Sequence, residues 1–276
     1  MRHFLIFFIF LSLGTQASEP KGFFIIPQLK DVLRPLGHAQ NPTLNPDHIS
    51  VLVWNMFKGK KDTWKRDYAN LTRKSDVLIL QEMFLDDQMK KVFADHVGFE
   101  YTTATSFLFD KKKIATGVAT ASLSSSSFQT FLRSQDREPI VNTPKVILVT
   151  TYPIDGSEQE LLVVNIHAIN FVTEAAFARH IFSVIPKIKN HQGPLIFAGD
   201  FNTWSQDRLD FINKMAKMLN LSEIRFFPDT RMRTFGNPLD HVFYRGLELK
   251  DAKVWGEVEG SDHKAMEASF RIPLFN

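Results

Sequence analysis

The feature that most constrains the fold is a series of short apolar runs, each about as long as one β-strand, that recur along the chain. Several of the runs are rich in β-branched residues, and this composition at this length favours buried strands over helices. The runs span Ile49–Trp54, Val77–Gln81, Val146–Tyr152, Leu161–Ile166, Leu195–Gly199, His241–Tyr244 and Ala265–Ile272.

Apolar stripes at helical spacing lie between several of these runs and predict helices. Their members are Trp64, Tyr68 and Leu71; Phe177, Ile181, Val184 and Ile188; and Leu209, Ile212, Ala216 and Leu219. Pro186 predicts a kink in the second helix, and Ser205 is a candidate N-cap for the third. The alternation predicts one mixed α/β domain over residues 49–276, after a proline-containing lead-in, residues 18–48, that we expect to be irregular.

The first 17 residues have the pattern of a secretory signal peptide. Phe4–Leu13 is an apolar run, and the small residues Thr15 and Ala17 stand before Ser18 like a cleavage site. Such a run is shorter than the stretch of about 20 residues that spans a bilayer, and an uncleaved anchor is the alternative. We therefore expect a secreted or periplasmic protein without stable membrane insertion after cleavage.

Composition excludes some chemistry. The chain contains no cysteine, which rules out disulfides, thiolate metal sites and cysteine nucleophiles. Its formal net charge is +3, a balance too mild to indicate nucleic acid by itself. A basic footprint must be local, and Lys58, Lys60 and Lys61 form one candidate cluster.

Polar residues stand where the predicted strands end or begin. Asn55, Glu82, His167, Asp200 and Asn202 follow strands, whereas Asp240, Asp262 and His263 precede them. Any one of them could form a turn, cap a helix or be a buried polar group. Together they indicate a catalytic site, because catalytic groups are commonly held at the ends of rigid strands.

These residues resemble the ordered motifs of the endonuclease/exonuclease/phosphatase superfamily, which includes DNase I. The motifs are Trp54-Asn55, Gln81-Glu82, Asn165-Ile166-His167, Gly199-Asp200-Phe201-Asn202, Leu239-Asp240 and Ser261-Asp262-His263. The longer stretches around them are similar to the YafD-like branch of bacterial proteins. The resemblance implies an α/β fold of four layers, a sandwich of two packed mixed β-sheets flanked by helices, with the site at one edge of the sheets.

The resemblance also implies metal-dependent phosphoester hydrolysis with Mg²⁺ or Mn²⁺. A hard divalent cation prefers oxygen ligands and neutralises phosphate oxygens. The expected ligands are Glu82 and Asp262, and Asn55 is expected to help position the metal or the phosphate.

The implied catalytic roles fall on the remaining motif residues. His263 is expected to contact the phosphate and assist proton transfer, with Asp240 holding its imidazole ring. Asp200 is expected to orient or deprotonate the attacking water, and Asn202 to stabilise developing negative charge. Either Asp200 or the His263–Asp240 pair could be the general base.

The sequence departs from the DNase I pattern near His167. DNase I-like enzymes pair this histidine with a glutamate of an earlier strand, but the expected stretch, residues 114–118, has no acidic residue. We therefore expect His167 to bind phosphate and not to act as a general acid. Glu138 is the nearby acidic candidate.

The substrate is less constrained than the chemistry. Asn170, Trp204, Arg231 and Arg233 are candidate substrate-binding residues, since cations attract phosphate and an aromatic ring can stack on a base. We expect a monomeric protein that cleaves nucleic-acid phosphodiesters. The alternatives are a phosphodiesterase or phosphatase for phospholipid headgroups or inositol phosphates, and a binding module without activity. No aromatic pair stands out in a polar hairpin, which counts against contact with a membrane.

Overall fold

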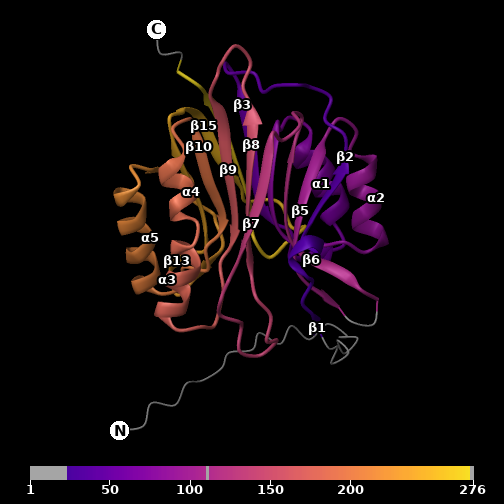
Figure 1. Cartoon of the computed structure of the whole chain (residues 1–276), viewed down its shortest axis with the longest axis vertical. Coiled ribbons are helices and arrows are strands. Elements are labelled where there is room, and N and C mark those ends of the chain that lie inside the picture. Colours follow the sequence, from indigo (N-terminus) through magenta and orange to yellow (C-terminus); the bar gives the residue numbers. More distant parts are fainter. Residues whose placement is uncertain (1–23, 110–111, 274–276) are drawn as a thin grey trace.

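Two β-sheets packed face to face, with helices against their outer faces, make up the protein (Figure 1). The computed structural model describes residues 24–109 and 112–273. The expected signal peptide, residues 1–17, lies outside the described residues. No helix in the described ranges has the length and apolar character needed to cross a membrane.

The first sheet has the strand order β1-β5-β6-β4-β3-β16-β15, and β2 also pairs with β5. Its strands are β1 (Phe24–Ile25), β2 (Leu33–Gly37), β3 (Ile49–Asn55), β4 (Val77–Phe84), β5 (Glu100–Phe109), β6 (Ile114–Ser122), β15 (Glu248–Trp255) and β16 (Ala265–Arg271). Neighbours β3 and β4 run parallel, whereas β16 is antiparallel to β3.

The second sheet has the order β11-β14-β10-β9-β8-β7. Its strands are β7 (Phe128–Arg133), β8 (Val146–Pro153), β9 (Glu160–His167), β10 (Leu195–Asp200), β11 (Ser222–Glu223) and β14 (Asp240–Arg245). Neighbours β9 and β10 are parallel, and β10 and β14 are antiparallel. A separate hairpin joins β12 (Arg233–Thr234) to β13 (Asn237–Pro238). Every strand predicted from the apolar runs is confirmed, and its observed ends lie within three residues of the predicted ends.

The central strands read as apolar runs because both of their faces are buried. Val53, Ile79, Val163 and Ile196 meet in the core between the sheets. The alternate residues of the same strands face outward under the helices, as Trp54 does.

Helices cover the two outer faces. α1 (Trp64–Thr72) and α2 (Asp87–Asp95) pack on the first sheet, and α3 (Glu174–Phe182), α4 (Ile185–Asn190) and α5 (Gln206–Met218) pack on the second. Short 3₁₀ turns, η1 (Leu29–Asp31) and η2 (Phe57–Gly59), complete the elements. The helix expected around Pro186 is two helices, because this proline occupies the first turn of α4, where its missing N–H is tolerated. Ser205 caps α5 as predicted, accepting the N–H of Arg208 at 3.2 Å.

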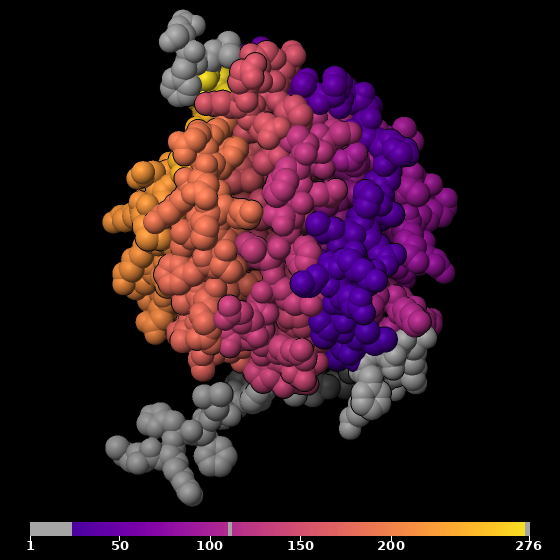
Figure 2. All heavy atoms as spheres, in the orientation of Figure 1, coloured from indigo at the N-terminus to yellow at the C-terminus, as the bar shows by residue number. Residues whose placement is uncertain are grey.

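The described part of the predicted irregular lead-in, residues 24–48, contains two short strands that the sequence analysis did not predict. β1 and β2 both pair with β5, and Figure 2 shows this segment in indigo along the side of the molecule. Pro35 lies opposite Thr102 within β2. A proline is accommodated there because β2 is an edge strand, where one side of the backbone needs no ladder hydrogen bond.

The two parallel strand pairs bring the polar motifs to one end of the sandwich. Asn55 ends β3 and Asp200 ends β10, and the Asn55 amide donates a hydrogen bond to the Asp200 carboxylate at 3.0 Å. Below this contact, the buried side chains of Gln81 and Asn165 join β4 to β9 through a hydrogen bond of 2.8 Å. The site is therefore built where the two sheets meet.

Candidate active site

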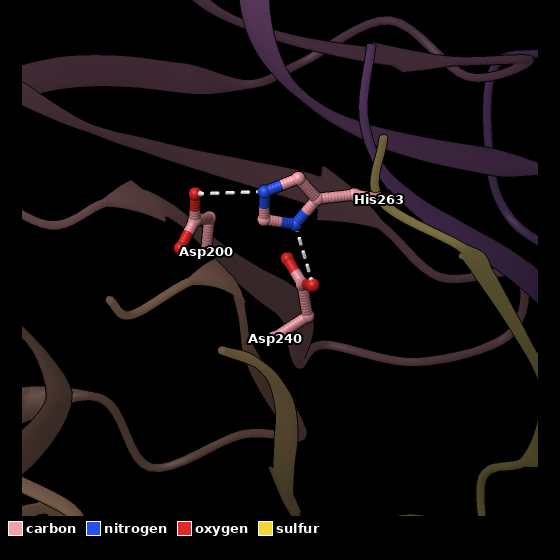
Figure 3. Close-up of side chains that lie close together, drawn as sticks. All are labelled: Asp200, Asp240 and His263. Atoms are coloured by element: carbon pink, nitrogen blue, oxygen red, sulfur yellow. Dashed lines mark hydrogen bonds and ion pairs between the residues drawn. The ribbon is translucent and has the colours of Figure 1, made fainter. Parts of the chain in front are cut away.

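His263 lies between two buried carboxylates (Figure 3). Its Nδ1 is 2.7 Å from Oδ2 of Asp240, and its Nε2 is 3.9 Å from Oδ2 of Asp200. Asp240 opens β14 and Asp200 ends the neighbouring β10, where the two residues are paired across the ladder. The short contact to Asp240 fixes the imidazole so that Nε2 points toward Asp200.

The Ser-Asp-His motif is fastened to the end of β3. The Ser261 hydroxyl donates to the backbone oxygen of Asn55 at 2.6 Å and accepts the N–H of His263 at 3.1 Å. The indole Nε1 of Trp54 donates to the backbone oxygen of His263 at 3.2 Å. These contacts explain why a serine precedes the acidic residue and the histidine, and why the motif holds its histidine at a fixed place.

The electrostatics of this group favour a proton on His263. Burial by itself lowers the pKa of His263, but the carboxylates of Asp240 and Asp200 raise it to about 10. Burial raises the pKa of Asp200 to about 7, with an opposing effect from the positive charge of His263. At neutral pH the site therefore holds an imidazolium beside a carboxylate that is poised to gain or lose a proton.

Asp200 is also held by two amide groups. Its Oδ2 accepts from the Asn55 side chain at 3.0 Å, and its Oδ1 accepts the backbone N–H of Asn202 at 2.9 Å. The Asn202 amide donates one N–H to the backbone oxygen of Ala168 at 2.9 Å. An amide nitrogen carries two N–H groups, so Asn202 keeps a second donor for a substrate oxygen.

Left-handed backbone marks two of the motif residues. Glu82 has φ 52° and Asn202 has φ 52°, a region that side-chain-bearing residues rarely adopt. Glu82 lies where the pairing of β4 with β6 shifts register, so it is part of a β-bulge that redirects its side chain. Such backbone strain, costing on the order of 1–3 kcal/mol per residue, is found mainly at functional sites.

The expected metal ligands have suitable chemistry. The Glu82 carboxylate lies 3.9 Å from the ammonium group of Lys58. Burial raises the pKa of Asp262, and the negative charge of Glu82 adds to the rise. Two carboxylates that repel one another and an amide oxygen from Asn55 fit a hard divalent cation, which would relieve the repulsion.

A second group of possible metal ligands is centred on His263 and forms the candidate catalytic triad. Among the described residues, Asp200, Asp240 and His263 form the group of three His, Cys, Asp or Glu whose ligand atoms lie within 4.8 Å of one another. The imidazolium of His263 supplies positive charge between these two carboxylates.

His167 lies in the same site but without the glutamate pairing of DNase I. Its Nε2 is 3.6 Å from Oδ2 of Asp200. Burial and the nearby charge of Lys145 lower the pKa of His167 well below its usual value, so the ring is neutral. Glu138 and Lys145 line one cavity of about 130 Å³ together with His167 and Glu82. Glu138 forms its ion pair with Lys145 at 3.5 Å, a partner that the sequence did not identify.

The candidate substrate-binding residues differ in how accessible they are to a substrate. The Arg231 guanidinium is buried, donating to Asp229 at 2.9 Å and to the backbone oxygen of Asp240 at 2.8 Å, so it supports the backbone at the start of β14. Arg233 also binds Asp229, and its side chain remains 42% exposed. Asn170 donates to Asn202 at 2.7 Å and accepts the indole N–H of Trp204 at 2.8 Å.

Sequence reasoning missed a buried cation and an exposed aromatic ring. Arg208 of α5 donates to the backbone oxygens of Asn202 and Val172, at 3.1 and 3.0 Å. Phe235 is 86% exposed at the tip of the β12–β13 hairpin. Phe235 is a single ring flanked by Arg233, Thr234 and Gly236, so it forms no aromatic pair within the hairpin and produces no apolar pattern in the sequence.

Comparisons with known proteins agree with this geometry. A sequence profile of the Endonuclease/Exonuclease/phosphatase family matches residues 52–263. The UPF0294 protein of Vibrio campbellii is 34% identical over 276 residues, covering 98% of this chain and 95% of its own length.

Two solved structures share the fold at low sequence identity. The human Nocturnin catalytic domain with bound sulfate anion superposes with a TM-score of 0.63 and 17% identity, over 87% of this chain and 97% of its own. The mannosyl-6-phosphatase of Bacteroides thetaiotaomicron superposes with a TM-score of 0.58 and 17% identity, over 80% of this chain and 99% of its own. The four-layer, DNase I-like architecture expected from the motifs is confirmed.

Proposed function

Because the chain belongs to the Endonuclease/Exonuclease/phosphatase family, a family of phosphoester hydrolases, we propose that it is a divalent-metal-dependent phosphodiesterase acting on nucleic acid. The observation that carries the proposal is the triad of Asp200, His263 and Asp240, in which a protonated histidine and a buried carboxylate face one another. A retained fold that only binds a partner has no need of this charge arrangement.

Asp200 is the general base in this proposal. With a pKa of about 10, His263 already holds its proton at neutral pH and cannot accept another from water. Asp200, with a pKa of about 7, is well matched to remove a proton from water at that pH. Of the two alternatives that the motifs left open, these pKa values favour Asp200.

The remaining residues bind and orient the phosphate. The His263 imidazolium attracts a phosphate oxygen, and the second N–H of Asn202 donates to the charge that develops as water attacks phosphorus. Neutral His167 donates or accepts a hydrogen bond without adding charge. The water oxygen forms a bond to phosphorus as the bond between phosphorus and the leaving oxygen breaks. The water proton passes to Asp200, and the leaving oxygen departs with a negative charge.

Glu82, Asp262 and Asn55 are the residues that would hold Mg²⁺ or Mn²⁺. When bound, the cation neutralises phosphate charge and stabilises the leaving oxygen. The placement of these oxygen donors beside the triad supports the assignment, and so does the mutual repulsion of the two carboxylates.

The cellular location and assembly belong to the same proposal. The apolar run at Phe4–Leu13 and the small residues before Ser18 support export to the periplasm or the medium. We propose that the protein acts as a monomer.

The test uses purified protein with Mg²⁺ or Mn²⁺, and with EDTA. Single-stranded DNA, RNA, plasmid DNA, phospholipid and a small phosphodiester are offered in parallel. We expect EDTA-sensitive cleavage of nucleic acid that Glu82→Gln and Asp200→Asn each reduce by at least 100-fold, with unchanged thermal unfolding. Turnover of phospholipid alone would reject the nucleic-acid substrate, and full activity of Glu82→Gln would reject the metal site.

A further inference from the structure

Three phenylalanines near the site have left-handed backbone. Phe57, Phe171 and Phe235 have φ values of 48°, 54° and 51°. A bulky side chain rarely adopts this conformation, which costs on the order of 1–3 kcal/mol. Phe171 is 64% exposed and Phe235 86% exposed, so burial of their rings does not offset the cost. An apolar ring held toward solvent in a strained loop calls for a partner outside the chain.

Hydrogen bonds join Phe171 and Trp204 to the catalytic residue Asn202. The Oδ1 atom of Asn170 accepts the backbone N–H of Phe171 at 2.8 Å and the indole N–H of Trp204 at 2.8 Å. The Nδ2 atom of the same side chain donates to Asn202 at 2.7 Å. The two aromatic residues are therefore positioned by one amide that also positions Asn202.

Trp204 links this group to the hairpin. Its ring centroid lies 6.5 Å from that of Phe235, with the planes at 70°. Asn237, on the other side of the hairpin tip, donates to the backbone oxygen of Trp204 at 3.4 Å. The β12–β13 hairpin and the loop after β9 are thus both fastened to Trp204.

Arg208 makes Trp204 rigid. The Arg208 guanidinium lies 4.5 Å from the Trp204 ring and 4.5 Å from the Phe177 ring, and its side chain is fully buried. Exposed rings mounted on a fixed support lose little conformational freedom on binding, which favours affinity.

We propose that Phe171 and Phe235, supported by Trp204, form a stacking platform for the unpaired bases of single-stranded nucleic acid beside the scissile phosphate. The inference rests on the proposed function and adds the substrate class. Bases have apolar faces that stack on aromatic side chains whatever their sequence. In a duplex those faces are already covered by neighbouring bases, so the platform selects single strands.

The surroundings of the rings favour a base over a lipid surface. Phe235 is the one apolar side chain in Arg233–Asn237, and Phe171 follows Asn170 and precedes a helix that begins with Glu174. A ring isolated among polar residues gives a membrane little apolar area to bury, whereas it is large enough to cover the face of one base. The half-exposed Arg233 supplies positive charge for the phosphate backbone next to the stacked base.

Binding is measured in the Asp200→Asn protein with Mg²⁺, so that no cleavage intervenes. Fluorescence anisotropy follows a single-stranded 10-mer, an abasic 10-mer of the same length, and a duplex. We expect Phe235→Ala and Phe171→Ala each to weaken binding of the single strand by about 5- to 150-fold and to leave the abasic strand unchanged. Phe235→Tyr keeps the ring and is expected to bind normally.

Phe128→Ala is the matched control, because Phe128 is 48% exposed on β7 and has no contact with this group. Equal losses for the base-containing and abasic strands, or no loss, would overturn the platform. Loss of vesicle binding in Phe235→Ala with unchanged oligonucleotide binding would assign the ring to a lipid surface instead. If the protein cleaves nucleic acid equally well with and without Phe171 and Phe235, the platform alone is rejected. If the protein neither binds nor cleaves any nucleic acid, the proposed substrate is rejected as well.

Discussion

The chemistry of the site rests on one histidine whose charge is set by two acidic residues. Asp240 contacts Nδ1 of His263 directly, whereas Asp200 faces Nε2 from farther away. The closer carboxylate keeps the imidazole charged, and the more distant one is left to titrate near neutral pH. We therefore propose different tasks for the two carboxylates: Asp240 holds the imidazole ring, and Asp200, whose pKa is raised mainly by burial, takes up a proton.

The first prediction concerns the pH dependence of catalysis. Asp200 must lose its proton to act as a base, so kcat/KM is expected to rise as pH increases through about 7. His263 must keep its proton to attract phosphate, so kcat/KM is expected to fall as pH increases through about 10. The measurement is a pH profile of kcat/KM for a small phosphodiester with saturating metal. A rising limb near pH 4, where an ordinary carboxyl titrates, would contradict the assignment of Asp200 as a perturbed base.

Residue identity was easier to predict than residue role. The motifs identified Asp200, Asp240 and His263 because each is a short, recognisable string at a strand end. Arg231 was expected to face the substrate, yet its guanidinium is buried against Asp229 and the backbone of Asp240. Sequence shows that a cation is present but not which partner lies within its reach in the folded chain.

At the scale of single elements, burial decided which strands could be predicted. The central strands are apolar on both faces and gave clear runs. β5 and β6 are rich in Thr, Ser and Ala, β7 is only partly buried, and much of β15 is exposed, so none of them had an apolar run. α2 was missed for a similar reason, since its buried residues are only Met89 and Phe93.

The contribution of α5 to the site leads to the second prediction. Arg208 satisfies the backbone oxygens of Asn202 and Val172, and these lie in the loops after β10 and β9. Arg208→Met approximates the length of the side chain but removes the donor to the buried oxygen of Asn202 and to the partly buried oxygen of Val172. We expect a loss of about 3 kcal/mol in the free energy of unfolding, measured in urea, because each unsatisfied buried group costs roughly 1–3 kcal/mol.

The same change should also lower kcat, since Asn202 loses a contact that fixes its left-handed backbone. Arg66→Met is the control, because the Arg66 side chain is 69% exposed on α1 and surface changes have small effects. A stable Arg208→Met protein with normal kcat would show that α5 has no part in positioning the site.

At the scale of the whole molecule, the active site exists only when both sheets are packed together. Asn55 and Glu82 come from strands of the first sheet and His263 from the turn before β16, whereas Asp200 and Asp240 come from the second sheet. Apolar patterning predicted strands but not which sheet each one joins. The sandwich of two sheets followed from the family resemblance and is confirmed, and the structure brings motif residues of both sheets together.

The polar bridge between the sheets should therefore stabilise fold and site together. Asn165 of β9 accepts from Gln81 of β4 at 2.8 Å and donates to the backbone oxygen of Ala119 at 2.9 Å, and both side chains are completely buried. Asn165→Leu removes these partners and leaves the Gln81 amide without an acceptor from β9. We expect the free energy of unfolding to fall by about 2–3 kcal/mol, in a single urea transition.

The double variant separates a lost hydrogen bond from a packing defect. If the Asn165→Leu penalty comes from the stranded Gln81 amide, adding Gln81→Leu should recover part of the stability, because replacing both partners with apolar groups removes the unsatisfied donor. Additive losses in the double variant would instead mean that leucine does not fit between the sheets. Gln81 precedes Glu82, and Asn165 lies two residues before His167. Recovery of stability without recovery of activity would therefore show that this bridge also sets the positions of the proposed metal ligand and the proposed phosphate-binding histidine.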